Sequence, residues 1–226
     1  MMTSILLIGC LLFGQDLSAA PLKENLDLPF DARGESGEEE DAPEVVVFYG
    51  QQFEGDGIFY VVDKSYSMRD SGELAIAQRE VVRNVQEFSD RVQFGIVFFD
   101  SQVVQFPANG QPAEANPSMK SAACSFVMSV VGASGSCCQQ GLAAGLKMAN
   151  LATPRRKVLI YVGDGGGTCN SEESAYLRIT LAQITAQNYQ RIQINTVGVL
   201  QPSTLGVDFM KRLAATNGGT YTRITH

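Results

Sequence analysis

Apolar residues along this chain follow two spacings. Between residues 45 and 225, runs of consecutive apolar residues that are typical of buried strands alternate with segments whose apolar residues recur every three or four positions, which is typical of helices packed on a core. The runs predict strands at 45–49, 58–62, 92–99, 103–106, 157–162, 192–199 and 220–225. The periodic segments predict helices at 73–88, 118–131, 139–151, 170–188 and 204–216.

This alternation predicts one α/β domain with a doubly wound, mostly parallel central sheet and helices on both faces. The run 157–162 is the most continuous, so we expect a central strand buried on both sides. Only three residues separate the runs 92–99 and 103–106, which indicates a hairpin and therefore one antiparallel strand. Two helix starts have predicted caps: Asp70 and Glu73 form a capping box before the helix 73–88, and Asn170 caps the helix 170–188. In the helix 118–131, the residues expected to face inward are Ala123, Cys124, Val127 and Val131.

Composition places the charge outside this domain. The chain has 226 residues, of which 45% are hydrophobic, enough for a single well-cored domain. Its net charge is −7, but residues 21–44 alone hold nine acidic residues against two basic ones. We interpret 21–44 as an acidic disordered linker and 45–226 as the folded domain. The domain itself is nearly neutral, which argues against a nucleic-acid partner.

The first 20 residues are typical of a secretory signal peptide. A nine-residue apolar core, 5–13, is followed by small residues at Ser18 and Ala20 for cleavage before Pro21. The core is too short to span a membrane. We therefore expect a secreted, periplasmic or cell-envelope protein. Lipid anchoring through Cys10 is a less favoured alternative, because Cys10 lies in the middle of the apolar run.

Oxygen-bearing side chains follow two of the predicted strands. Asp63, Ser65 and Ser67 come directly after the strand 58–62, and Asp164 follows the strand 157–162. The helix 139–151 leads into the second of these strands, so its N-terminus, next to Ser136, lies at the same carboxyl edge of the sheet. All five donors are oxygens, which selects Mg²⁺, with Ca²⁺ or Mn²⁺ as alternatives. With only two carboxylates, such a site should keep waters and an open position.

The stretch Asp63-Lys64-Ser65-Tyr66-Ser67 resembles the Asp-x-Ser-x-Ser motif of the metal-ion-dependent adhesion site in von Willebrand factor type A domains. Asp164-Gly165 is similar to the family's later aspartate-glycine. Gly135-Ser136 takes the place of the usual Gly-Thr, so that a serine supplies the hydroxyl. The resemblance covers about residues 45–224. It departs from the family after Ser136, where two cysteines follow.

The resemblance implies a Rossmann-like domain that binds a protein partner through its metal. The hydroxyls would ligate Mg²⁺ directly, the aspartates often through water, and a partner's Glu or Asp would fill the open position. This predicts a non-enzymatic adhesion or interaction module. A metal-free scaffold of the same fold is one alternative.

A haloacid dehalogenase-like hydrolase with Asp63 as nucleophile is the other alternative. It lacks its usual second acid, because position 65 is serine. The chain's single histidine, His226, is its last residue, so no Ser-His-Asp arrangement is expected in the core. The glycines of 163–167 lack the spacing of a phosphate-binding loop.

Four cysteines remain after removal of the signal peptide, an even number that favours disulfides in an exported protein. A bridge between Cys137 and Cys169 would hold the rim of the metal site. Cys124 and Cys138 could pair or stay as buried thiols. Three connectivities are open, and a thiolate-metal or redox role for Cys137, Cys138 and Cys169 is a less favoured alternative.

Overall fold

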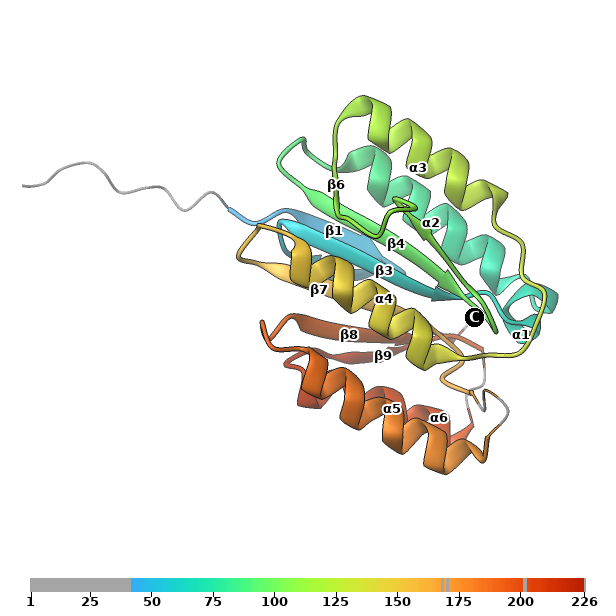
Figure 1. The fold of residues 1–226 in the computed structure, drawn as a ribbon. Helices are drawn as coiled ribbons and strands as arrows, with labels where there is room; N and C mark the ends of the chain where they lie inside the picture. Colours follow the sequence, from blue (N-terminus) through green and yellow to red (C-terminus); the bar gives the residue numbers. More distant parts are fainter. Residues whose placement is uncertain (1–41, 168, 170, 201–202, 226) are drawn as a thin grey trace, which may run out of the picture. The chain divides into compact units, whose positions relative to one another are not determined.

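A seven-stranded sheet forms the centre of the fold in the computed structural model (Figure 1). The structure describes residues 42–167, 169, 171–200 and 203–225, so the predicted signal peptide and most of the acidic linker lie outside the described residues. The strand order is β5-β4-β3-β7-β8-β9, with β6 pairing β4 beside β5. The strands are β3 (Gly57–Asp63), β4 (Gln93–Phe99), β5 (Val103–Phe106), β6 (Ala113–Glu114), β7 (Lys157–Gly163), β8 (Gln193–Gly198) and β9 (Tyr221–Arg223).

The predicted fold class is confirmed. Strands β3, β4, β7, β8 and β9 are parallel, whereas β5 and the short β6 run antiparallel to β4. The helices are α1 (Tyr66–Asp70), α2 (Glu73–Glu87), α3 (Pro117–Ser129), α4 (Cys138–Leu151), α5 (Glu173–Gln187) and α6 (Thr204–Thr216). A separate hairpin of β1 (Val45–Phe48) and β2 (Gln51–Glu54) precedes the sheet.

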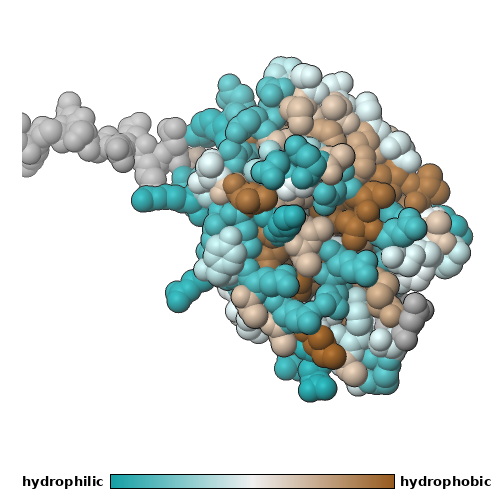
Figure 2. Space-filling model, in the orientation of Figure 1, coloured by the Kyte–Doolittle hydropathy of each residue, from teal (hydrophilic) through white to brown (hydrophobic). Residues whose placement is uncertain are grey.

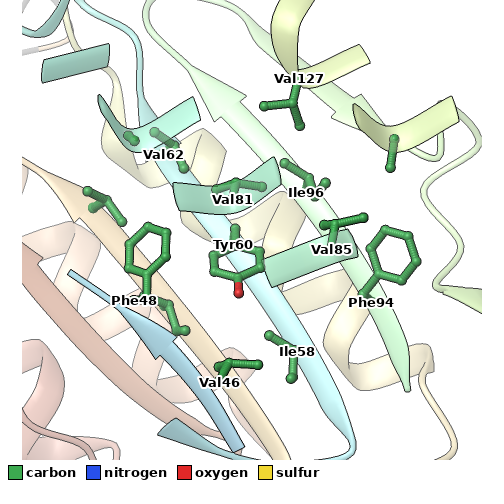
Figure 3. Close-up of a cluster of buried hydrophobic side chains, with 14 of the residues drawn as sticks. Val46, Phe48, Ile58, Tyr60, Val62, Val81, Val85, Phe94, Ile96 and Val127 are labelled. Carbon is green, nitrogen blue, oxygen red and sulfur yellow. The ribbon is translucent and has the colours of Figure 1, made fainter. Parts of the chain in front are cut away.

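Two hydrophobic layers enclose the sheet. One contains α1, α2, α3 and the β1–β2 hairpin, where Phe48 packs on Tyr60 and the side chains of Val81 and Val127 also lie (Figure 3). The other contains α4, α5 and α6. All seven residues of β3 are buried, as are six of the seven in β7, because helices cover both faces of these central strands.

Four details differ from the sequence predictions. Helix α2 starts after Gly72, which has a φ of +84°, and no capping box forms between Asp70 and Glu73. Helix α3 ends at Ser129, because the backbone is extended at the next residue, and Val131 is 72% exposed rather than inward. Helix α5 has Glu172 as its N-cap, whose carboxylate accepts the N–H groups of Ser174 and Ala175, and Asn170, the predicted cap, lies outside the described residues. Glu44, expected in the linker, accepts the N–H of Ser89 on the folded unit.

Candidate functional site

The first donor loop leaves the carboxyl end of β3. Asp63 closes the strand with its side chain buried, and its Oδ1 accepts the backbone N–H of Ser65 at 2.7 Å. The Oγ atoms of Ser65 and Ser67 are 3.1 Å apart. This loop is short because α1 begins at Tyr66, directly after Ser65, and so all three donors stay at the strand end.

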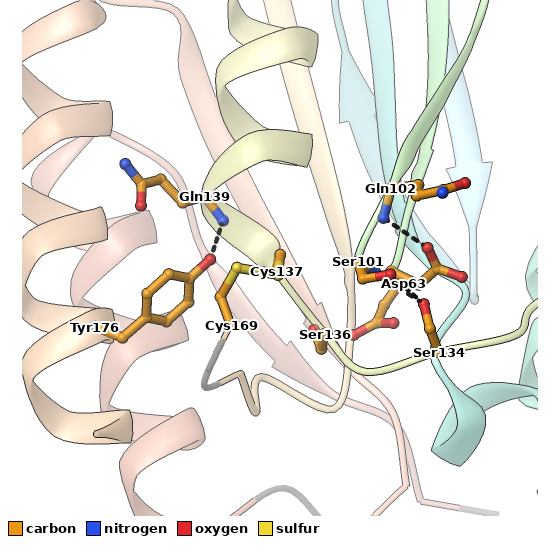
Figure 4. Close-up of a disulfide and its surroundings, with 10 residues drawn as sticks. Asp63, Ser101, Gln102, Ser134, Ser136, Cys137, Gln139, Cys169 and Tyr176 are labelled. Carbon is orange, nitrogen blue, oxygen red and sulfur yellow. Dashed lines mark hydrogen bonds between the residues drawn. A yellow bond between two sulfur atoms is a disulfide. The ribbon is translucent and has the colours of Figure 1, made fainter. Parts of the chain in front are cut away.

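The second and third donor loops meet the first at this edge. Ser136, just before α4, donates its hydroxyl to Asp63 Oδ2 at 3.0 Å (Figure 4). Asp164, just after β7, accepts the hydroxyl of Ser67 at 2.6 Å. Strands β3 and β7 are neighbours, and the chain leaves them toward opposite faces of the sheet. Such a topological switch point is where doubly wound sheets bind their ligands.

The five residues predicted from sequence therefore form one connected oxygen cluster. Hydrogen bonds run from Ser136 to Asp63, and from Ser65 through Ser67 to Asp164. The cluster is buried at Asp63 and Ser65, half-buried at Ser136 and Asp164, and exposed at Ser67. The inner side of the cluster is thus buried in the protein, and its outer side is exposed to solvent.

The spacing of these oxygens fits a hard cation. In an octahedral Mg²⁺ shell with Mg–O distances of 2.0–2.1 Å, adjacent oxygens are about 3 Å apart. The three oxygen pairs across the cluster are 2.6, 3.0 and 3.1 Å apart, which are ordinary hydrogen-bond lengths and leave the oxygens close enough together to share one ion. Among the described residues no group of three or more His, Cys, Asp or Glu side chains could hold a metal, so a site here depends on its hydroxyls.

The electrostatics of the cluster favour a bound cation. Burial, and secondarily the nearby carboxylate of Asp164, raises the pKa of Asp63 from 3.8 to about 7, although hydrogen bonds from Ser65 and Ser136 oppose the shift. A proton or a cation is therefore needed to offset the negative charge held at the base of the cluster.

A disulfide joins the second and third loops. Cys137, next to Ser136, is bonded to Cys169, and the N–H of Cys169 reaches the carbonyl of Ser136 (Figure 4). This pairing belongs to one of the three disulfide connectivities that the sequence left open. Cys124 and Cys138 are free thiols that belong to the hydrophobic layers on opposite faces of the sheet and therefore cannot pair. The disulfide also excludes a thiolate-metal site made of Cys137, Cys138 and Cys169.

Sequence reasoning missed a third aspartate at this edge. Asp100 directly follows β4, and its carboxylate forms a buried ion pair with Lys64, 2.5 Å from Nζ to Oδ2. Burial alone would raise the pKa of Asp100, but bonds from Lys64 and the Gln102 N–H hold it below the ordinary value. The signal was available in the sequence, since Asp100 directly follows the predicted strand 92–99 as Asp63 follows the predicted strand 58–62.

A cavity of about 460 Å³ lies beside the donor loops. Lys64, Asp100 and Ser134 line its polar side, and the apolar side is formed by residues such as Phe126 and Val131. Figure 2 shows apolar patches on an otherwise polar face of the molecule. The cavity thus offers an apolar contact beside the first and second donor loops, and none of the five cluster residues lines it.

Comparison with solved structures identifies the fold. A von Willebrand factor type A structure from Catenulispora acidiphila is 19% identical over 75% of this chain and 38% of its own length, with a TM-score of 0.64. The pilus adhesin SpaC from Lactobacillus rhamnosus GG is 14% identical over 75% of this chain and 28% of its own, with a TM-score of 0.56. The PilB minor pilin from Streptococcus sanguinis is 11% identical over 75% of this chain and 57% of its own, with a TM-score of 0.59.

This chain therefore has the fold of a von Willebrand factor type A domain. It spans less than two thirds of each of these three proteins. No family profile matches the sequence. No curated protein matches it either.

Proposed function

We propose that this chain is a metal-dependent protein-binding module. Its five clustered side chains hold Mg²⁺, and the ion takes a carboxylate from a Glu or Asp of a partner protein; Ca²⁺ and Mn²⁺ suit the same donors. The ligands are Asp63, Ser65, Ser67, Ser136 and Asp164. The observation that carries the proposal is the convergence of five oxygen-bearing side chains from three loops into one hydrogen-bonded cluster.

Each residue has a distinct role in this proposal. The buried Asp63 sets the negative charge at the base and orients Ser65 and Ser136 through hydrogen bonds. Ser67 and Asp164 form the outer side of the cluster, where a partner approaches. When bound, the ion supplies a positive charge with a coordination position open to an incoming carboxylate.

An adhesion or interaction role agrees with the descriptions of some of the similar solved structures. Two of the similar structures are described as a pilus adhesin and a minor pilin. The disulfide is consistent with an oxidising compartment, and so with a secreted or envelope location. No helix within the described residues is long and apolar enough to cross a membrane.

A hydrolase is disfavoured by the surroundings of Asp63. Such a hydrolase has a second acid two residues after its nucleophile to act as general acid, and the residue at that position here is Ser65. The alternative of a metal-free scaffold predicts that the chain does not bind Mg²⁺ at this cluster, whereas our proposal predicts that it does.

The test is selection of a random peptide display library on the full chain in Mg²⁺, with elution by EDTA. We expect the eluted peptides to share a Glu or Asp whose replacement by Gln or Asn abolishes binding. We also expect a Ser67→Ala bait to retain none of them. Selection of the same peptides in EDTA, or a set without a shared acidic residue, would refute the proposal.

A further inference from the structure

The Lys64–Asp100 ion pair is placed between two of the donor loops. Lys64 lies between Asp63 and Ser65 in the first loop. Its ammonium reaches Asp100, whose side chain is 2% exposed, while that of Lys64 is 7% exposed. An ion pair this deeply buried is costly to form unless further hydrogen bonds satisfy it.

Asp100 makes those further bonds to the second donor loop. Its Oδ2 accepts the N–H of Ala133 at 3.3 Å, and its backbone carbonyl accepts the N–H of Cys137 at 2.9 Å. Its Oδ1 accepts the N–H of Gln102 at 2.8 Å, which fixes the carboxylate in the turn after β4. One aspartate therefore contacts both sides of Ser136 in the chain and the residue next to Asp63.

The backbones of the first and second donor loops are also in close contact. The N–H of Tyr66 donates to the carbonyl of Ser134 at 3.1 Å. A Cβ added at Gly132 would lie only 2.0 Å from the carbonyl oxygen of Lys64. The position of the second loop is thus set directly by the backbone of the first, with Asp100 bonded to both.

We infer that Asp100, acting through Lys64 and the 133–137 backbone, is a positioning residue that sets Ser136 against Asp63, Ser65 and Ser67. The inference rests on the proposed metal function of these residues. Asp100 does not ligate the ion; its carboxylate is occupied by Lys64, Gln102 and Ala133. Residues of this kind behind metal ligands typically change metal affinity by about 10- to 100-fold when replaced.

Two single variants separate positioning from simple charge. Asp100→Asn removes a negative charge near the site, and Lys64→Met removes a positive one. If only long-range charge mattered, the first would weaken Mg²⁺ binding and the second would strengthen it. Positioning predicts that both weaken it, by about tenfold or more.

The measurement is calorimetric titration of the full chain with MgCl₂. Asp56→Asn is the matched control, because Asp56 also pairs with a cation, Arg156, and accepts a backbone N–H, but lies before β3 at the other edge of the sheet. It should bind Mg²⁺ as wild type does. Opposite effects of the two test variants, or no effect of either, would overturn the inference.

A double variant guards against misfolding of the single ones. Lys64→Met/Asp100→Leu replaces a buried ion pair by apolar side chains, a change that is often neutral or stabilising. It conserves net charge, so a charge effect predicts wild-type affinity. Positioning predicts weaker binding, because the acceptor for the Ala133 N–H is lost.

Amide hydrogen exchange in EDTA tests the inference without metal. We expect the amides of Ala133 and Cys137 to exchange faster in both single variants than in Asp56→Asn. Unchanged exchange would overturn the positioning role even if the wild-type chain failed to bind Mg²⁺, a failure that would count against the proposed function instead.

Discussion

Replacing Asp63 by Asn should stabilise the metal-free protein at alkaline pH while abolishing Mg²⁺ binding. Asn keeps the size of the side chain and an acceptor for the Ser65 N–H, but it removes the buried negative charge. In the absence of a cation that charge is unfavourable, since burial and Asp164 together raise the pKa of Asp63 to about 7.

The magnitude follows from the two pKa values. With a folded pKa of about 7 and an unfolded value of 3.8, the folded protein binds more protons than the unfolded chain between these pH values. The free energy of unfolding therefore falls as the pH rises through this window, and it levels off above about pH 7. At 1.36 kcal/mol per tenfold change in proton affinity, the loss is roughly 4 kcal/mol.

Thermal unfolding in EDTA at pH 4 and pH 8 measures this difference. We expect Asp63→Asn to melt above wild type at pH 8, by about 8–16 °C for a domain of this size, and close to wild type at pH 4. Saturating Mg²⁺ should raise the melting temperature of wild type alone. A variant less stable than wild type at pH 8, or a difference independent of pH, would refute this reasoning.

Three further predictions concern the surroundings of the site. A Cys137→Ala/Cys169→Ala variant loses a bridge between positions 32 residues apart, so it should be less stable by about 3–4 kcal/mol in chemical denaturation. It should also bind Mg²⁺ more weakly in calorimetry, and an unchanged affinity would contradict a role of the bridge in the site. The buried Cys138 thiol, whose pKa is raised to about 12 by burial, should resist N-ethylmaleimide in the native protein, and rapid labelling seen by mass spectrometry would contradict its placement. Gly141→Ala should cost about 1–3 kcal/mol in chemical denaturation, because its Cβ would lie 2.5 Å from the Phe99 ring, whereas the matched Gly135→Ala meets nothing within 4 Å and should be neutral.

Much of the fold could be predicted because local patterns coincide with tertiary burial. The run at 157–162 is buried on both faces in the structure, as its continuity indicated, and the helix predicted at 204–216 has those bounds. Local details were wrong where a single backbone angle decided them. Helix α2 begins at residue 73 as predicted, but its N-cap is Gly72 with a positive φ, so the predicted capping box with Asp70 does not form. The extended backbone at Val130 ends α3 before Val131 can turn inward.

The candidate site could be predicted as far as topology determines it. Asp63 and Asp164 follow adjacent parallel strands, so the sheet order brings them to one edge. The cysteine pairing could not be predicted, because it depends on which face of the sheet each helix covers. The ion pair of Asp100 with Lys64 could not be predicted either, because it depends on where the two side chains point once β3 and β4 are paired.

The central claim is that the five clustered oxygens hold a divalent cation. Calorimetric titration of the full chain with MgCl₂ at pH 8 tests it most directly, with Asp164→Ala as the site variant and Asp56→Asn as the control. The acidic segment 21–44 is present in every sample, so any weak binding there cancels. We predict one saturable Mg²⁺ per chain, lost in Asp164→Ala and kept in Asp56→Asn. Equal titration curves for wild type and Asp164→Ala would contradict the account.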